Sequence, residues 1–278
     1  MRLGAPVFGG IAGPDEWIAA LKTRGYRAAY CPVDEKAGDS VVAAYQKAAA
    51  GAGIVIAEVG AWSNPISADE AIRREAMKLC RERLALADRI GARCCVNIAG
   101  SRNPANWDGP HAENYSKDTF DLIVESVRGI IDAVKPTRTF YTLEPMPWVP
   151  PDSADGYLEL LSAIDRPRFA VHFDPVNIIS SPDRFYRNGD LIGNFIAKLG
   201  PRIMSCHAKD IALSTKLTVH LDEVRPGLGG MDYRVYLKEL SSLDPDLPLL
   251  VEHLEKEEDY RLAVDYIRGV AASISLTL

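Results

Sequence analysis

The sequence of 278 residues contains few cysteines, and their arrangement suggests neither a disulfide framework nor a zinc ribbon. The five cysteines are an odd number and show no paired spacing. Four of them (Cys31, Cys94, Cys95 and Cys206) lie in apolar runs, where a free cysteine behaves as a small hydrophobe. This usage favours a reducing compartment, so we expect a cytoplasmic protein.

Long apolar runs and an excess of basic residues are also absent. No uninterrupted apolar segment approaches the ~20 residues that cross a bilayer, and the first residues lack the pattern of a secretion signal. The formal net charge of −6 disfavours nucleic acid as a ligand, because its binders usually present a basic face. We therefore expect no membrane segment, no nucleic-acid partner and a small-molecule substrate.

Eight short apolar runs alternate with amphipathic stretches from one end of the chain to the other. This alternation is typical of parallel strands that are each followed by a helix. The length also suits one barrel, for which about 250 residues is typical. We expect a single (β/α)₈ TIM barrel over residues 1–278, with strands near 3–8, 26–33, 54–62, 93–100, 139–146, 169–177, 203–209 and 248–254.

Helix starts and the longest connections can also be placed. Ser67 and Glu70 form a capping-box pattern at the start of a long helix that Gly91 ends, and Ser116 precedes a second helix over 117–134. The longest connections, expected as loops, are 101–115, 145–154, 178–190 and 210–231. All four follow strands, on the face where a barrel builds its active site.

Four of the apolar runs each carry one residue of a metal-ligand type at or near the end of the strand. Glu144, Asp174, His207 and Glu252 are 30, 33 and 45 residues apart, about one strand–helix unit each. In a parallel barrel these strand ends meet at one face. Three carboxylates and one imidazole meeting there would bind a divalent cation, and their apolar neighbours make an unpaired charge at these positions costly.

With these residues placed, the chain resembles the xylose-isomerase-like barrel superfamily, in particular its sugar phosphate isomerase/epimerase group. The resemblance covers nearly the whole chain. It implies that Glu144, Asp174, His207 and Glu252 bind one divalent ion, with Mn²⁺ the first choice and Mg²⁺, Co²⁺ or Zn²⁺ the alternatives. It also implies that Glu144 and Glu252 are catalytic and move protons. The motifs that carry it are 143–145, His172-Phe-Asp174, 206–210, 226–232 and 251–252.

The chain departs from the ketose epimerases of this group at two positions. They carry a substrate-contacting histidine three residues after the metal aspartate, where this chain has Asn177. Their arginine ahead of the glycine-rich loop is not in register with Arg225, which lies two residues before Gly227. The identity of the substrate therefore does not follow from the resemblance.

Four residues are expected to bind the substrate. Lys209 lies two residues after His207 and so faces the same way, and Asn177 follows Asp174. His111 and Arg225 lie on the two longest loops and are expected to close over the substrate.

Two further histidines flank the proposed ligands. His172 lies two positions before Asp174 and is expected one layer deeper, in a hydrogen-bonded role. His253 follows Glu252 and should point away from the site if the strand continues.

The favoured reaction is abstraction of a proton next to a carbonyl, which gives a metal-stabilised enediolate and leads to isomerisation or epimerisation of a sugar. The alternative is a lyase that cleaves C- or O-linked keto-glycosides by β-elimination, together with a small β-rich partner subunit. The sequence is also compatible with a homo-oligomer.

A DNA-repair endonuclease on this fold is disfavoured by the five histidines and the negative charge. A non-catalytic binding barrel would keep all function after metal removal.

Overall fold

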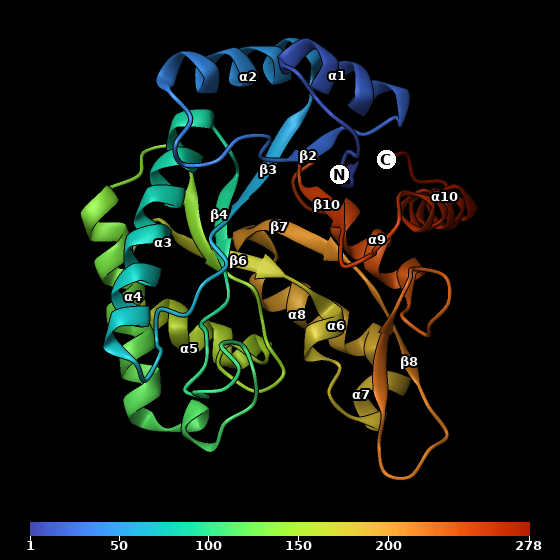
Figure 1. Ribbon diagram of the computed structural model, residues 1–278. Helices are drawn as coiled ribbons and strands as arrows, with labels where there is room; N and C mark the ends of the chain where they lie inside the picture. The colour runs from blue at the N-terminus through green and yellow to red at the C-terminus, as the bar shows by residue number, and fades with distance from the viewer.

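The computed structural model describes all of residues 1–278 and contains an eight-stranded parallel sheet curved into a nearly closed TIM barrel (Figure 1). The strands follow one another around it in the order β1-β10-β7-β6-β5-β4-β3-β2, and each neighbouring pair in this order is parallel. Their bounds are β1 Arg2–Gly4, β2 Ala28–Tyr30, β3 Val55–Gly60, β4 Cys94–Asn97, β5 Phe140–Leu143, β6 Phe169–Phe173, β7 Ile203–Ala208 and β10 Pro248–Val251. The predicted fold is confirmed, and each strand is shorter than expected.

The barrel closes between its first two strands at a glycine. β1 and β2 form no ladder, but the Arg27 backbone N–H donates to the carbonyl of Leu3 over 2.9 Å. A methyl group on Gly4 would overlap the carbonyl oxygen of Ala28. The two strands can therefore approach this closely only because residue 4 has no side chain.

Helices surround the barrel (Figure 1), and side-chain caps mark where two of them begin. The Ser116 hydroxyl accepts from Thr119 N at the start of α4, as predicted. The predicted capping box is wrong by two residues, because Asp69, not Ser67, caps α3. The helices are α1 Pro14–Thr23, α2 Asp39–Ala52, α3 Glu70–Ile90, α4 Lys117–Val134, α5 Ala154–Ile164, α6 Pro175–Ile178, α7 Pro182–Tyr186, α8 Asn188–Leu199, α9 Tyr233–Ser241 and α10 Glu257–Ser273, with short 3-10 turns at Ala112–Tyr115 and Gly200–Arg202.

Three of the expected loops contain regular structure. The segment 210–231 forms an antiparallel hairpin of β8 (Asp210–Leu213) and β9 (Leu221–Val224), which projects from the barrel at the lower right of Figure 1. Helix α7 lies within 178–190, and a 3-10 turn ends the segment 101–115. The hairpin was missed because β9, Leu-Asp-Glu-Val, has two exposed acidic residues and no apolar alternation.

One carboxylate fixes the base of this hairpin. Asp210 accepts hydrogen bonds from the backbone N–H groups of Ile211, Gly227, Gly229 and Met231 over 2.9 to 3.1 Å. A side chain on Gly229 would overlap the Asp210 carboxylate. Asp210 therefore joins the end of β7 to the glycine-rich turn before α9.

None of the helices combines the length and the apolar character needed to cross a membrane. The apolar residues instead form one core of 62 buried residues between the barrel and its helices.

Replacing Gly4 by alanine should destabilise the protein, because the added methyl group meets a backbone carbonyl that cannot move without opening the β1–β2 contact. We expect a loss of about 1–3 kcal/mol in the free energy of unfolding, measured by urea denaturation. Gly10→Ala is the matched control, since a methyl group there meets no atom within 4 Å. Equal stability of the two variants would show that the contact does not constrain the barrel.

Candidate metal centre

Four acidic or imidazole side chains meet at the C-terminal face of the barrel, and each is placed there by the end of a strand. Glu144 and Glu252 directly follow β5 and β10, and His207 is the second-to-last residue of β7. Asp174 follows β6 and caps α6, where its Oδ1 accepts from Val176 N over 2.9 Å. This use of Oδ1 leaves Oδ2 facing the other three side chains.

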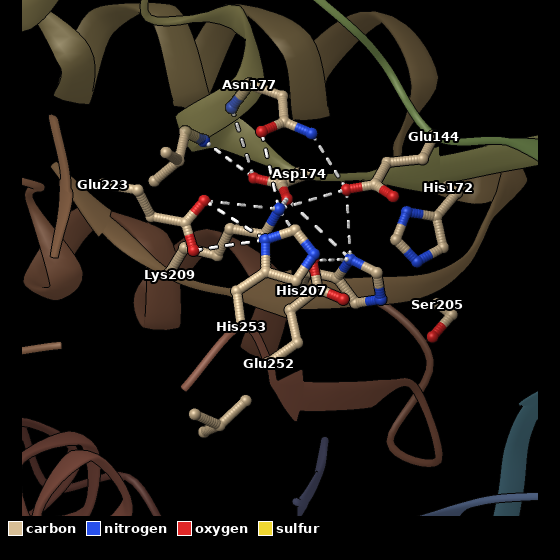
Figure 2. Close-up of polar contacts among 12 residues, drawn as sticks. Glu144, His172, Asp174, Asn177, Ser205, His207, Lys209, Glu223, Glu252 and His253 are labelled. Atoms are coloured by element: carbon tan, nitrogen blue, oxygen red, sulfur yellow. Dashed lines mark hydrogen bonds and ion pairs between the residues drawn. The ribbon is translucent and has the colours of Figure 1, made fainter. Parts of the chain in front are cut away.

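The imidazole of His207 is the common neighbour of the three carboxylates (Figure 2). Its Nδ1 lies 2.7 Å from Glu252 Oε1, 3.2 Å from Glu144 Oε1 and 3.8 Å from Asp174 Oδ2. One ligand atom from each of the four residues lies within 4.8 Å of the others. The structure therefore brings together the four residues predicted as metal ligands.

The ammonium of Lys209 lies against the same carboxylates. Its Nζ is 2.7 Å from Glu252 Oε1, 2.9 Å from Asp174 Oδ2 and 3.4 Å from Glu144 Oε1. Only 1% of the side chain is exposed, so these carboxylates replace the water that an ammonium normally requires. Lys209 faces the site as predicted; its contact with a substrate stays a prediction.

A second group of polar side chains, centred on the single carboxylate of Glu58, lies below this cluster in the barrel interior. Glu58 in β3 meets His207 Nε2 at 3.0 Å, His172 Nε2 at 3.2 Å and the Ser205 hydroxyl at 2.8 Å. These partners lie on β6 and β7, which are not neighbours of β3 in the sheet, so the contacts cross the barrel. The prediction that His172 is hydrogen-bonded one layer deeper is confirmed.

For most of the acidic groups in the barrel, attraction to nearby cations shifts the pKa more than burial does. Burial alone would raise the pKa of Glu58, but His207 and hydrogen bonds from both histidines hold that pKa well below its usual range. Burial likewise opposes ionisation of Glu252, yet His207 and Lys209 lower its pKa to about 2. Glu144 differs, because burial dominates and raises its pKa.

The same carboxylates raise the pKa values of the two basic groups, His207 and Lys209. Burial would lower the pKa of His207, but Glu252, Glu58 and Glu144 raise it well above the usual value for histidine. The pKa of Lys209 is raised in the same way, against burial, by Asp174, Glu252 and Glu144.

The donor set fits a divalent cation. Asp174 Oδ2 and Glu252 Oε1 are buried and close to nitrogen atoms, yet neither takes part in a hydrogen bond of good geometry. Three carboxylates with one imidazole nitrogen suit Mn²⁺, Mg²⁺, Co²⁺ or Zn²⁺. A metal-binding histidine commonly donates its other ring N–H to a carboxylate, and Glu58 is placed to accept it from His207.

The remaining predicted substrate residues fall in two groups. Asn177 lies in the cluster, where its Nδ2 donates to Glu144 Oε1 over 2.9 Å. His111 instead caps a 3-10 turn through Glu113 N, and the Arg225 guanidinium faces Asp259 at 3.6 Å. Neither of these two is hydrogen-bonded or ion-paired to the cluster, and their substrate contacts stay predictions.

Three residues of the site were not predicted. Glu58 is a single acidic residue within an apolar run, the same signal that identified Glu144, and could have been found by it. Glu223 arrives on the hairpin and lies 3.8 Å from Lys209 Nζ. His253 was expected to point away only if the strand continued, but β10 ends at Val251. With a φ of 58°, His253 instead places its Nε2 3.7 Å from Glu252 Oε1.

The comparisons with known proteins agree with this architecture. Residues 18–270 match the family model described as xylose isomerase-like TIM barrel. A D-psicose 3-epimerase structure determined in the presence of D-fructose is 17% identical, with a TM-score of 0.68 over 97% of this chain and 99% of that chain. A 3-keto-D-glucoside 4-epimerase from E. coli, in its apo form, is 14% identical, with a TM-score of 0.68 over 97% and 99%.

A xylose isomerase-like TIM barrel protein from Mycobacterium smegmatis in complex with magnesium is 16% identical, with a TM-score of 0.66 over 98% of this chain and 97% of that chain. At these identities the likeness to solved structures concerns the fold. The curated proteins include no match to the sequence.

Replacing Lys209 by methionine should destabilise the chelator-treated protein. The change keeps the length of the side chain but removes the cation shared by three buried carboxylates. Loss of one partner from a buried ion pair costs about 3–5 kcal/mol, so thermal and urea unfolding in EDTA should show a decrease of this order. Lys216→Met, at the exposed tip of the hairpin, is the control. A Lys209→Met protein as stable as this control would contradict the charge balance described above.

Proposed function

Because the chain belongs to the xylose isomerase-like TIM barrel family, we propose that it is a divalent-metal-dependent sugar isomerase or epimerase. The observation that carries this proposal is the position of two glutamates. Glu144 and Glu252 come from separate strands, β5 and β10, yet both contact His207 Nδ1. Two carboxylates around one centre are what an exchange of protons at neighbouring positions of a sugar requires.

Glu144, Asp174, His207 and Glu252 would hold the metal ion, with Mn²⁺ the first choice. A bound divalent cation would supply a Lewis acid that polarises the carbonyl of the substrate. The protein contributes the orientation of the donors: Asp174 is fixed by the start of α6, and His207 is fixed by Glu58. Lys209, which is held at the same carboxylates, would move aside or share them with the ion, and His207 would bind the ion as the neutral imidazole.

The two glutamates would divide the proton transfer. Glu252, with a pKa lowered to about 2, is ionised at neutral pH and would accept the proton from carbon; because so low a pKa makes it a weak base, this role depends on its position beside the abstracted proton. Glu144, whose pKa is raised by burial, is suited to return one. Asn177 donates to Glu144 and is placed to hold that carboxyl group or an oxygen of the substrate.

A second candidate begins with the same proton abstraction. If the substrate carries a leaving group beta to the abstracted proton, elimination follows and the enzyme is a keto-glycoside lyase. A structural neighbour that acts on a 3-keto-D-glucoside supports a substrate of this class. Product analysis separates the two reactions.

The metal assignment predicts that His207→Ala loses most of its bound metal, because it removes the only nitrogen donor of the set. Wild-type protein and the variant are loaded with Mn²⁺, desalted and measured by elemental analysis. His220→Ala, on the exposed hairpin tip, should bind as much metal as wild type. The same metal content in His207→Ala as in wild type would rule out this centre.

The reaction class predicts deuterium exchange. Metal-loaded protein incubated in D₂O with a panel of ketoses, keto-glycosides and their phosphates should place deuterium at the carbon next to the carbonyl of one substrate. Glu144→Gln and Glu252→Gln keep the shape of the site and should lower the rate by roughly 10²–10⁴-fold. Glu255→Gln, exposed and three residues away, is the control. If both glutamine variants turn over normally with metal bound, neither glutamate is the base.

A further inference from the structure

A pocket opens beside Glu252 and is walled by the first three strand–helix units. Its volume is about 430 Å³, within the ~300–1,000 Å³ range of small-molecule sites. The walls include Val7 and Ile11 after β1, Tyr30 at the end of β2, and Trp62 after β3. A larger cavity of about 770 Å³ involves the beginnings of β5 and β6, the opposite end of the barrel from the cluster.

The lining of this pocket lacks positive charge. It contains no lysine, arginine or histidine, and its only charged side chains are Glu58 and Glu252. Two polar groups of the wall already have partners: the Tyr30 hydroxyl donates to Val251 O over 3.2 Å, and the Cys31 thiol donates to Val33 O over 3.2 Å. A phosphate placed here would meet two carboxylates and no cation.

The outer wall depends on a close contact between a glycine and an indole ring. A methyl group on Gly60 would lie 2.5 Å from Trp62 Nε1, so the ring lies directly over the backbone at the end of β3. Trp62 is 43% exposed and also borders an outer groove together with Trp107. The exposed indole therefore offers an apolar face at the entrance of the pocket, on which a ring-sized apolar substituent can stack.

The pocket and the cluster meet at one residue. Glu252 lines the pocket, whereas Glu144, Asp174 and His207 do not. A substrate whose reacting carbons lie between Glu144 and Glu252 would thus extend past Glu252 toward Trp62.

We infer that the substrate is an unphosphorylated sugar carrying an uncharged, apolar substituent of about the size of an aromatic ring, and that this substituent lies between Glu252 and Trp62. The inference rests on the proposed function for the position of the reacting carbons. The chemical character of the pocket itself depends only on its lining.

Equilibrium binding tests the pocket without turnover. Metal-loaded Glu144→Gln protein, which keeps the whole lining, is titrated by calorimetry with phenyl β-D-glucoside, D-glucose and D-glucose 6-phosphate. Burial of the ring should make the phenyl glucoside bind about tenfold tighter than glucose or more, with glucose 6-phosphate weakest. This order would hold even if the protein catalyses no isomerisation, so failure here is distinct from failure of the deuterium experiment.

Two variants locate the binding. Adding Trp62→Ala to the Glu144→Gln protein should abolish the preference for the phenyl compound. Adding Trp107→Ala instead should preserve it, because Trp107 borders the outer groove and does not line this pocket. Gly60→Ala, which displaces the indole, should act like Trp62→Ala. Equal or tighter binding of glucose 6-phosphate, or a preference for the phenyl group that Trp62→Ala leaves unchanged, would overturn the inference.

Discussion

The interior of this barrel is organised by one imidazole held between a single carboxylate on one side and three carboxylates on the other. His207 contacts Glu58 through one nitrogen and three strand-end carboxylates through the other. Burial of so many acids would be prohibitive without compensation, and His207 and Lys209 provide it. The ring orientation, the ionisation of Glu252 and the separation of the acids all follow from this balance. Any change to one of these charges alters the ionisation of the others.

The two parts of the chain contribute different functions to the face of the barrel. Strands β5, β6, β7 and β10 supply the acids and the imidazole of the candidate metal centre. Strands β1 to β3 and the segments after them supply apolar walls beside it. Glu58 is the exception, since it belongs to β3 and reaches across the barrel to β7. Under the proposed function, the apolar walls within residues 1–62 could change and alter substrate preference, while the acids and the imidazole on the other strands stay in place.

The sequence predicted the parts of the site that depend on position along a strand. Glu144, Asp174 and Glu252 follow apolar runs, and parallel strands must bring such ends together, so their proximity could be inferred without a structure. The partners of Glu58 lie 114 to 149 residues away, and a contact across the barrel leaves no local pattern. His253 depends on one backbone torsion with positive φ, which its neighbours do not indicate. The hairpin could not be predicted, because β9 has two exposed acidic residues in place of the alternating apolar and polar residues that indicate a strand.

Asp210 makes the base of the hairpin, which borders the centre, independent of the tip. Four backbone N–H groups bind this carboxylate at the base, so the geometry of the base does not depend on the tip. The tip, residues 214–220, includes Leu217, which is 98% exposed. Insertions and deletions concentrate at exposed loop tips, where no buried contact is lost. Among diverging descendants of this chain, the hairpin tip should vary freely in length and sequence, while Asp210 and the glycines that approach it should change only together.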